Sequence, residues 1–150
     1  MPNNTLIGIA GVHHVVSELS RRGMVALPTV KNTAAYDIVA LNVEGTRHAN
    51  IQVKSSSKRA LFFPMPPPEK IRVGPRDYYV LVRWIEADER FECFLLKGKV
   101  ARAAVEENLK IQRARVKQGS RNRLFPCVPL GPNHTKRTNS WARAWKKWAL

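Results

Sequence analysis

Cysteine is scarce in this sequence of 150 residues, in which Cys93 and Cys127 are the only two. They form no Cys-x-x-Cys pair, so their spacing gives no support to a zinc site or a thioredoxin-like redox motif. One disulfide is compatible with two cysteines, but a reduced protein is the simpler interpretation, because disulfides are rare in reducing compartments. We therefore expect a cytoplasmic protein.

Long apolar runs are also missing. No segment approaches about 18 consecutive apolar residues, the length at which a helix can span a membrane, so we expect no membrane partner. The first residues, MPNNTLIGIAGVHHVV, lack a basic start and a long apolar core, so we expect no signal peptide. The four histidines have no metal-ligand spacing. One role remains open for His13 or His14: either could act as a catalytic base that the first predicted helix places beside a metal site.

Acidic residues are few: 11 Asp and Glu stand against 26 Lys and Arg, giving a net charge of +15. Such a charge favours polyanions, meaning DNA, RNA or an anionic membrane surface. Residues 101–150 contain 12 Lys and Arg against Glu106 and Glu107, a net charge of +10, whereas residues 1–50 carry +1. This asymmetry predicts a binding surface in the last third, and a merely soluble basic face is the alternative.

Hydrophobic periodicity predicts helices over residues 6–22 and 99–117, the first with an apolar stripe at Val12, Val15, Val16 and Leu19. In the second, we expect Val100, Ala104 (or Ala103), Leu109 and Ile111 to point roughly inward. Alternation and β-branched residues predict strands at 24–30, 36–43, 47–55, 77–85 and 90–96. Prolines at 64–68 make residues 56–76 mostly loop, and residues 119–139 read as irregular. The order predicts one α/β domain with a mixed sheet and a helix packed on it.

The chain closes with SWARAWKKWAL, in which Trp141, Trp145 and Trp148 fall on one side of a helix. We expect this helix to pack on the domain. The alternative is that the tryptophans stack on bases or enter a membrane interface, with neighbouring Lys and Arg contacting phosphates.

Polar residues interrupt two of the apolar strands. Asp37 directly precedes Ile38, and on the next strand Gln52 and Lys54 share one face because side chains alternate along a strand. A tight hairpin at residues 44–45 would bring the three groups together. A carboxylate, an amide oxygen and an ammonium suit Mg²⁺-assisted phosphodiester hydrolysis. The alternative is that Gln52 and Lys54 simply face solvent.

The segments GVHHVVSELSRRG, YDIV, IQVKSSS, DYYVLVRW and FECFLL, in this order, resemble the PD-(D/E)XK nuclease superfamily. The resemblance is to its Gln-x-Lys members, among them intron-type homing endonucleases and small bacterial relatives. It implies a restriction-endonuclease-like αβββαβ core, with a mixed central sheet flanked by helices, and a basic C-terminal extension. It also implies a Mg²⁺ or Mn²⁺ cofactor, catalytic roles for Asp37, Gln52, Lys54 and Glu18, and a metal site at Asp37, Gln52 and Val53.

One family position differs in this sequence. The superfamily often carries a Gly-Glu pair near the start of its first helix, and the matching pair here is Gly11-Val12. A metal-dependent DNA endonuclease is therefore the first interpretation, and a non-catalytic nucleic-acid-binding module derived from a nuclease is the second. A basic RNA- or ribosome-associated protein, a third interpretation, rests on charge alone.

The expected partner is DNA, duplex or branched, and the resemblance implies a homo-oligomer, either dimer or tetramer. We expect a nuclease-like domain at residues 1–118, with a basic segment and Trp-rich helix at 119–150 packed on it. The predicted DNA contacts are Ser55, Ser56, Lys58, Arg59, Arg113, Arg115, Lys117, Arg121 and Arg123.

Overall fold

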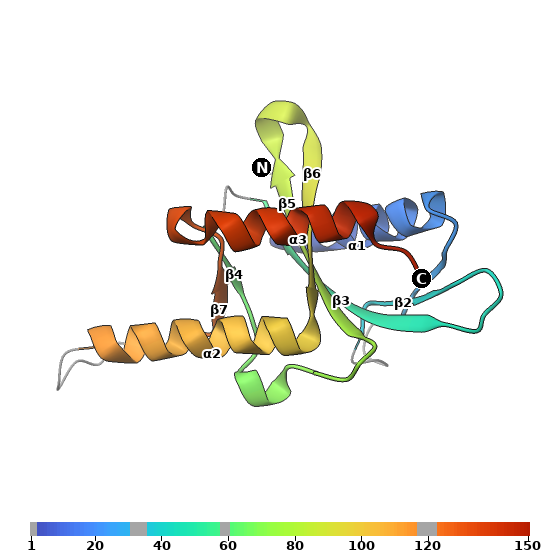
Figure 1. The fold of residues 1–150 in the computed structure, drawn as a ribbon. Coiled ribbons are helices and arrows are strands. Elements are labelled where there is room, and N and C mark those ends of the chain that lie inside the picture. Colours follow the sequence, from blue (N-terminus) through green and yellow to red (C-terminus); the bar gives the residue numbers. More distant parts are fainter. Residues whose placement is uncertain (1–2, 31–35, 58–60, 117–122) are drawn as a thin grey trace.

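The computed structural model describes residues 3–30, 36–57, 61–116 and 123–150, and Figure 1 shows the arrangement of their helices and strands. The α-helices are α1 (Asn4–Arg21), α2 (Gly98–Arg115) and α3 (Thr135–Lys147). The strands are β1 (Val25–Pro28), β2 (Ile38–Leu41), β3 (His48–Ser56), β4 (Phe62–Pro64), β5 (Asp77–Ile85), β6 (Arg90–Lys97) and β7 (Cys127–Pro129). Short 3-10 helices occupy Pro68–Lys70 (η1), Glu86–Asp88 (η2) and Pro132–His134 (η3).

A mixed sheet forms the centre of the fold. Its strand order is β1-β2-β3-β5-β6, in which β3 and β5 are parallel and the other neighbours are antiparallel. Ile38 of β2 lies opposite Ile51 of β3, and Gln52 lies opposite Tyr79 of β5. The prediction of a mixed central sheet flanked by helices is confirmed.

Helix α1 covers one face of this sheet. The Asn3 side chain caps its first turn by accepting hydrogen bonds from the backbone N–H groups of Thr5 and Leu6. Its fully buried residues recur at every fourth position: Ile7, Gly11, Val15 and Leu19. Gly23, at a φ of 81°, follows the last turn, a conformation that glycine adopts at little cost. The helix predicted for residues 6–22 is therefore present, and it begins earlier because of the Asn3 cap.

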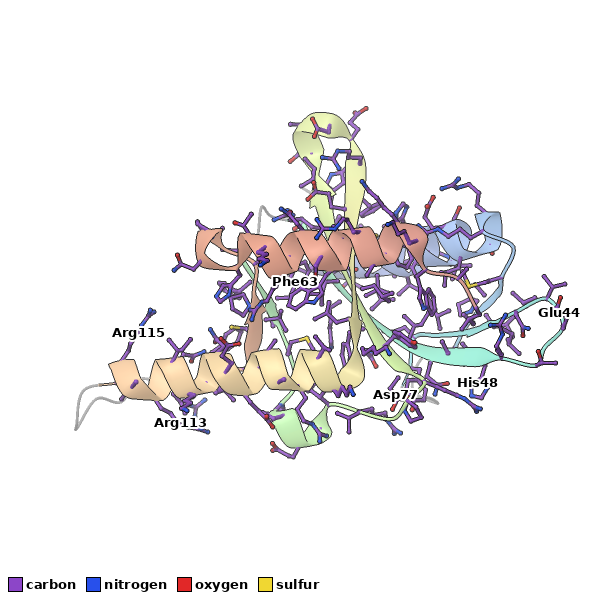
Figure 2. All side chains as sticks on the ribbon, in the orientation of Figure 1. Glu44, His48, Phe63, Asp77, Arg113 and Arg115 are labelled. Atoms are coloured by element: carbon purple, nitrogen blue, oxygen red, sulfur yellow. The ribbon has the colours of Figure 1, made fainter. Side chains whose placement is uncertain are left out.

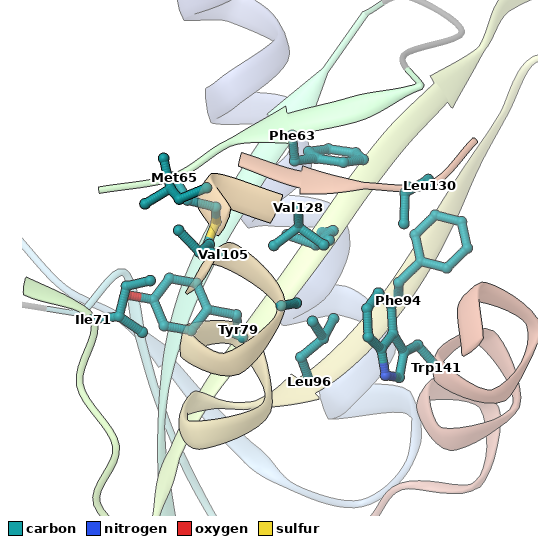
Figure 3. Close-up of a cluster of buried hydrophobic side chains, with 14 residues drawn as sticks. Phe63, Met65, Ile71, Tyr79, Phe94, Leu96, Val105, Val128, Leu130 and Trp141 are labelled. Carbon is teal, nitrogen blue, oxygen red and sulfur yellow. The ribbon is translucent and has the colours of Figure 1, made fainter. Parts of the chain in front are cut away.

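Helix α2, together with the small β4–β7 sheet, covers the opposite face. Side chains along β5 alternate between the two faces, so that Tyr79 and Leu81 join the α2 side while Val80 and Val82 join the α1 side. The cluster on the α2 side is drawn in Figure 3, where Phe63, Val105 and Val128 meet between the two sheets. The two faces thus give the protein two hydrophobic clusters, one on each side of a single sheet.

The connection from β3 to β5 departs from the expected αβββαβ order. It carries strand β4 and the 3-10 helix η1 in place of a crossover α-helix. The prolines at positions 64, 66, 67 and 68 exclude a regular helix here because proline removes a backbone donor and clashes with the preceding turn. Residues 119–139 also contain more structure than predicted, since β7, η3 and the start of α3 lie there.

Helix α3 packs along the edge strand β6. Trp141 belongs to the cluster on the α2 side and Trp145 to the cluster on the α1 side, and both side chains are buried. The Trp148 ring stacks on Tyr78, with ring centroids 5.1 Å apart. All three tryptophans therefore contact the domain, Trp141 and Trp145 as buried side chains and Trp148 as a partly buried one. Over the described residues, no helix combines the length and the apolar character needed to cross a membrane.

Candidate active site

Asp37 lies where strands β2 and β3 part. Its Oδ2 atom accepts hydrogen bonds from Gln52 Nε2 at 2.8 Å and from the backbone N–H of Val53 at 2.7 Å. Strand β2 begins at Ile38, opposite Ile51, so the residues of β3 beyond Ile51 have no β2 residue beside them. The Asp37 carboxylate takes the place of that missing partner. The structure thus brings Asp37 and Gln52 together.

The backbone around Asp37 is held on both sides. Its N–H donates to the carbonyl of Ile51 at 2.9 Å, and its own carbonyl accepts from the N–H of Thr29 at 2.9 Å. The Thr29 hydroxyl also donates to the carbonyl of Tyr36. With β3 and the segment at Thr29 both fixing it, the carboxylate needs little reordering to bind a ligand, and such preorganisation is what a catalytic or metal-binding group requires.

A partly buried hydrogen-bond network supports this corner, and sequence reasoning missed it. Asp77, labelled in Figure 2, accepts hydrogen bonds from the hydroxyl of Tyr36 at 3.1 Å, from Asn50 Nδ2 at 3.2 Å and from the N–H of Gly74 at 2.9 Å. The Arg72 guanidinium lies over the Tyr36 ring, 5.0 Å from its centroid. Asp77 is the first residue of β5, and Asp37 directly precedes β2. An aspartate at the start of an apolar strand is therefore the sequence signal that could have identified Asp77. The network orients Tyr36, the residue before Asp37.

Lys54 follows Gln52 on the same face of β3, the face that also carries Tyr79 and Leu81. Its side chain is half-buried, and no described residue forms an ion pair with it. Ser56 shares this face by alternation. Ser55 does not: its Oγ is buried on the α1 side, without a hydrogen-bond partner among the described residues, and Gly11 passes directly over it. Ser55 therefore packs α1 onto β3.

Three oxygen donors can face a cation at this corner: a carboxylate, an amide and a backbone carbonyl. The N–H and C=O of one strand residue point to the same side, so the Val53 carbonyl faces the Asp37 side, as its N–H does. Asp37 Oδ1 accepts no hydrogen bond from the described residues. Within the same residues, no group of three or more His, Cys, Asp and Glu side chains converges. A site with one carboxylate fits Mg²⁺, which keeps several waters and binds through one or two carboxylates.

A cleft of about 450 Å³ opens beside Asp37, between the N-terminal half of α1 and the end of β1. Val12 and His13 line it together with Asp37 and Val53. The position at which the superfamily often carries a glutamate therefore faces the same cleft as Asp37. His14, the other histidine considered as a base, lies elsewhere, stacked on Phe91 with ring centroids 4.7 Å apart.

Glu18 is not brought to Asp37. Its carboxylate pairs with Arg21 at 2.9 Å and Arg22 at 3.4 Å, in a different cleft on the other flank of α1. The hydrogen bond from Arg21 lowers the pKa of the Glu18 carboxyl below its usual value. Glu18 follows Val12 by six positions, which turns the helix far enough to carry Glu18 away from the cleft that contains Asp37.

The predicted DNA contacts are spread over the surface. Figure 2 shows Arg113 and Arg115 projecting from the outer end of α2, at the opposite side of the view from β2 and β3. Arg123 is exposed in the segment before β7. The four remaining positions lie outside the described residues: Lys58, Arg59, Lys117 and Arg121. The basic end of α2 and the Asp37 corner are thus separate surfaces.

Both cysteines are free thiols and both are buried. Burial raises the pKa of Cys93 to about 12 and also raises the pKa of Cys127. Since the thiolate is the reactive form, neither residue is a nucleophile at neutral pH.

The architecture defines a nuclease fold of the restriction-endonuclease-like type. The bacterial homing endonuclease I-Ssp6803I superposes with a TM-score of 0.54 and 18% sequence identity, over 97% of this chain and 92% of that one. Hjc, a Holliday junction resolvase from the archaeal hyperthermophile Archaeoglobus fulgidus, gives a TM-score of 0.45 and 22% identity, over 61% of this chain and 73% of that one. No family model and no curated protein matches the sequence. The similarity to I-Ssp6803I establishes the fold.

Proposed function

We propose that this protein is a metal-dependent DNA endonuclease that hydrolyses phosphodiester bonds at the corner formed by Asp37, Gln52, Val53 and Lys54. The observation that carries the proposal is the Asp37 carboxylate held against Gln52 and the Val53 backbone, with Lys54 next on the Gln52 face of β3. The fold shared with a bacterial homing endonuclease supports it.

In this proposal Asp37, Gln52 and the Val53 carbonyl hold Mg²⁺ or Mn²⁺. When bound, such an ion would supply the Lewis-acid chemistry that phosphodiester hydrolysis requires. The Gln52 amide rotates to present its oxygen in place of the Nε2 group that now donates to Asp37. Lys54 contributes an ammonium close to the charge that develops on the phosphate oxygens.

The DNA partner follows from charge and fold together. A net charge of +15 attracts a polyanion without selecting its sequence, and the fold is one that DNA-cleaving enzymes use. The exposed guanidinium groups of Arg113, Arg115 and Arg123 are proposed to contact the DNA backbone away from the cutting site. Double-strand cleavage would use two copies of the chain, so we also propose a homo-oligomer.

Cleavage of linear duplex and four-way-junction DNA, with Mg²⁺ and with EDTA, tests the proposal. Asp37→Asn and Lys54→Ala should each lower the cleavage rate by about 10²-fold or more, the typical effect of removing one electrostatic catalytic group. Lys97→Ala, which removes an exposed charge on β6, is the matched control and should cut at close to the wild-type rate. DNA affinity should change by less than about threefold in all three variants, because one charge among many contributes little.

Each other outcome has a defined meaning. If Asp37→Asn and Lys54→Ala both cleave DNA at the wild-type rate, the active site lies elsewhere in the protein. DNA binding by a wild-type protein that never cleaves would favour the second function, a nucleic-acid-binding module whose chemistry has been lost. A preference for structured RNA over duplex DNA would favour the third interpretation.

A further inference from the structure

A second large cleft lies away from Asp37, between the C-terminal half of α1, the β5–β6 hairpin and α3. Its volume is about 670 Å³. Figure 1 shows the hairpin projecting beyond α3 on this side of the molecule. Five basic side chains line the cleft: Arg21, Arg22, Arg83, Arg90 and Lys146. Two carboxylates, those of Glu18 and Glu92, line it with them, so the cleft carries an excess of three positive charges.

Each carboxylate is shared between two guanidinium groups. Glu92 accepts from Arg83 Nη2 at 2.6 Å through Oε2 and from Arg90 Nη2 at 3.0 Å through Oε1. Glu18 is shared in the same way by the two consecutive arginines at the end of α1. Arg90 also pairs with Asp88 at 3.2 Å. These carboxylates orient the guanidinium groups, while the side chains that line the cleft keep their excess of positive charge.

Aromatic rings fix two of these arginines further. The Arg22 guanidinium lies 4.4 Å from the centroid of the Trp145 ring and also donates to the Trp145 carbonyl. The Arg83 guanidinium lies 5.5 Å from the Phe94 ring centroid. A planar guanidinium already held in place loses little conformational entropy when it binds a phosphate.

A purely structural role explains only part of this arrangement. Arg22 ties α1 to α3, and Arg83 pairs with Glu92 across the β5–β6 hairpin. The same role does not explain Arg21, whose side chain is 71% exposed, or Arg90, at 52%. Lys146 is exposed as well and forms no ion pair with a described residue. These three charges face solvent at the rim of the cleft: Arg21 is paired with Glu18, Arg90 with Asp88 and Glu92, and Lys146 has no ion-pair partner among the described residues.

We propose that this cleft binds a backbone phosphate of the DNA, at a distance from the phosphate that is cleaved. The inference rests on the proposed function. The cleft beside Asp37 and the arginine cleft lie on opposite flanks of α1, and the residues of α1 that line them are centred about nine positions apart. Along the helix axis that offset is about 14 Å at 1.5 Å per residue, the length of roughly four base-pair steps of about 3.4 Å, and the width of the helix adds to the separation of the clefts.

The surface between the two clefts does not oppose such a path. Glu18 is the only carboxylate in α1, and it is directed into the arginine cleft. The exposed residues along this part of α1 carry no acidic group: Ile9 and His13 line the Asp37 cleft, and Ser17 lies one turn further along the helix. DNA that crosses α1 can therefore reach both clefts without passing a negative group. Its second contact would set how the duplex is oriented over Asp37 and would carry no sequence information.

DNA affinity in EDTA, measured by fluorescence anisotropy at 50 and 200 mM salt, tests the inference without requiring cleavage. The variant Arg21→Gln/Arg90→Gln/Lys146→Gln removes the three rim charges, and its fold is checked by thermal unfolding. The control, Lys70→Gln/Lys99→Gln/Lys110→Gln, removes three exposed charges that do not line the cleft. We expect the cleft variant to lose about tenfold or more in affinity and to flatten the salt slope by about one to two units. The control should lose less than about threefold.

Equal losses of affinity in the two variants would overturn the inference, because net charge alone would then explain binding. An unchanged affinity in the cleft variant would overturn it as well. A second arm titrates inorganic phosphate and a nucleoside monophosphate by calorimetry. Tight binding of the nucleotide that the cleft variant abolishes, with DNA affinity unchanged, would assign the cleft to a small phosphorylated ligand and overturn the DNA assignment. Loss of cleavage in Lys54→Ala concerns the proposed function alone, because these binding measurements do not depend on cutting.

Discussion

At the scale of single residues, Gly11 shows how closely α1 approaches the strand that carries Gln52 and Lys54. A Cβ atom at this position would lie 2.0 Å from Ser55 Oγ and 3.1 Å from Ser55 Cβ. Gly8, in the preceding turn, has open space in the same direction, with no atom within 4 Å. The two glycines of one helix therefore differ in what a methyl group would meet.

We expect Gly11→Ala to lower the free energy of unfolding by about 1–3 kcal/mol, the usual cost of overpacking. Gly8→Ala is the matched control and should raise it by about 0.5–1 kcal/mol, since alanine favours a helix interior over glycine. Adding Ser55→Gly to Gly11→Ala should recover part of the loss, because it removes both clashing atoms. Urea unfolding of the four proteins measures these values. A Gly11→Ala protein as stable as wild type would mean that α1 does not contact β3 this closely.

The catalytic roles of Asp37, Gln52 and Lys54 stay predictions. The sequence was sufficient to place Asp37 beside Gln52, because strand alternation and a short hairpin connection bring these two positions together. It was not sufficient for Glu18, whose two arginine partners lie in its own helix and direct its carboxylate to another cleft. It also could not assign Ser55, since the space beneath Gly11 is a property of the packed structure. Local pattern determines the face of a strand, and packing determines what that face meets.

At the scale of elements, β5 and β6 were predicted almost to the residue, because their apolar runs end at charged turns. The apolar face predicted for helix α2 was partly wrong: Val100, expected to point inward, is 36% exposed, whereas Ala101 and Val105 are buried. Its alanine-rich sequence permits two neighbouring stripes, and only the β4–β7 sheet decides between them. That small sheet pairs strands of three residues each from distant parts of the chain, a pairing for which no local pattern exists.

Helix α3 gives the prediction for this scale. Trp141 and Trp145 are 8% and 5% exposed and join the two clusters at the β6 edge. Trp141→Ala and Trp145→Ala should each lower the free energy of unfolding by about 3–5 kcal/mol, the usual cost of truncating a buried aromatic residue. Arg143→Ala, on the exposed face of the same helix, should change it by less than about 0.5 kcal/mol.

Chemical denaturation measures these three variants, and DNA affinity is measured beside it. Tryptophan variants that unfold like wild type yet no longer bind DNA would make α3 a contact surface, contrary to its packing here.

At the scale of the whole molecule, the net charge of +15 governs how the protein meets DNA. If about six phosphates are neutralised, the logarithm of the association constant should fall with the logarithm of salt concentration at a slope of about −5. Measurements in EDTA between 50 and 200 mM salt keep cleavage from interfering. A slope near zero, or no binding at low salt, would contradict the nucleic-acid interpretation on which the endonuclease and its alternatives all rest.

The central claim is that Asp37, Gln52 and the Val53 carbonyl form a cation site beside Lys54. Anomalous diffraction from crystals soaked in Mn²⁺ tests it most directly, with Asp37→Asn crystals as the control. We predict one anomalous peak next to the Asp37 carboxylate, with oxygen ligands at about 2.1 Å, and no peak there in Asp37→Asn. No peak near Asp37 in the wild type, or a peak that persists unchanged in Asp37→Asn, would contradict the account.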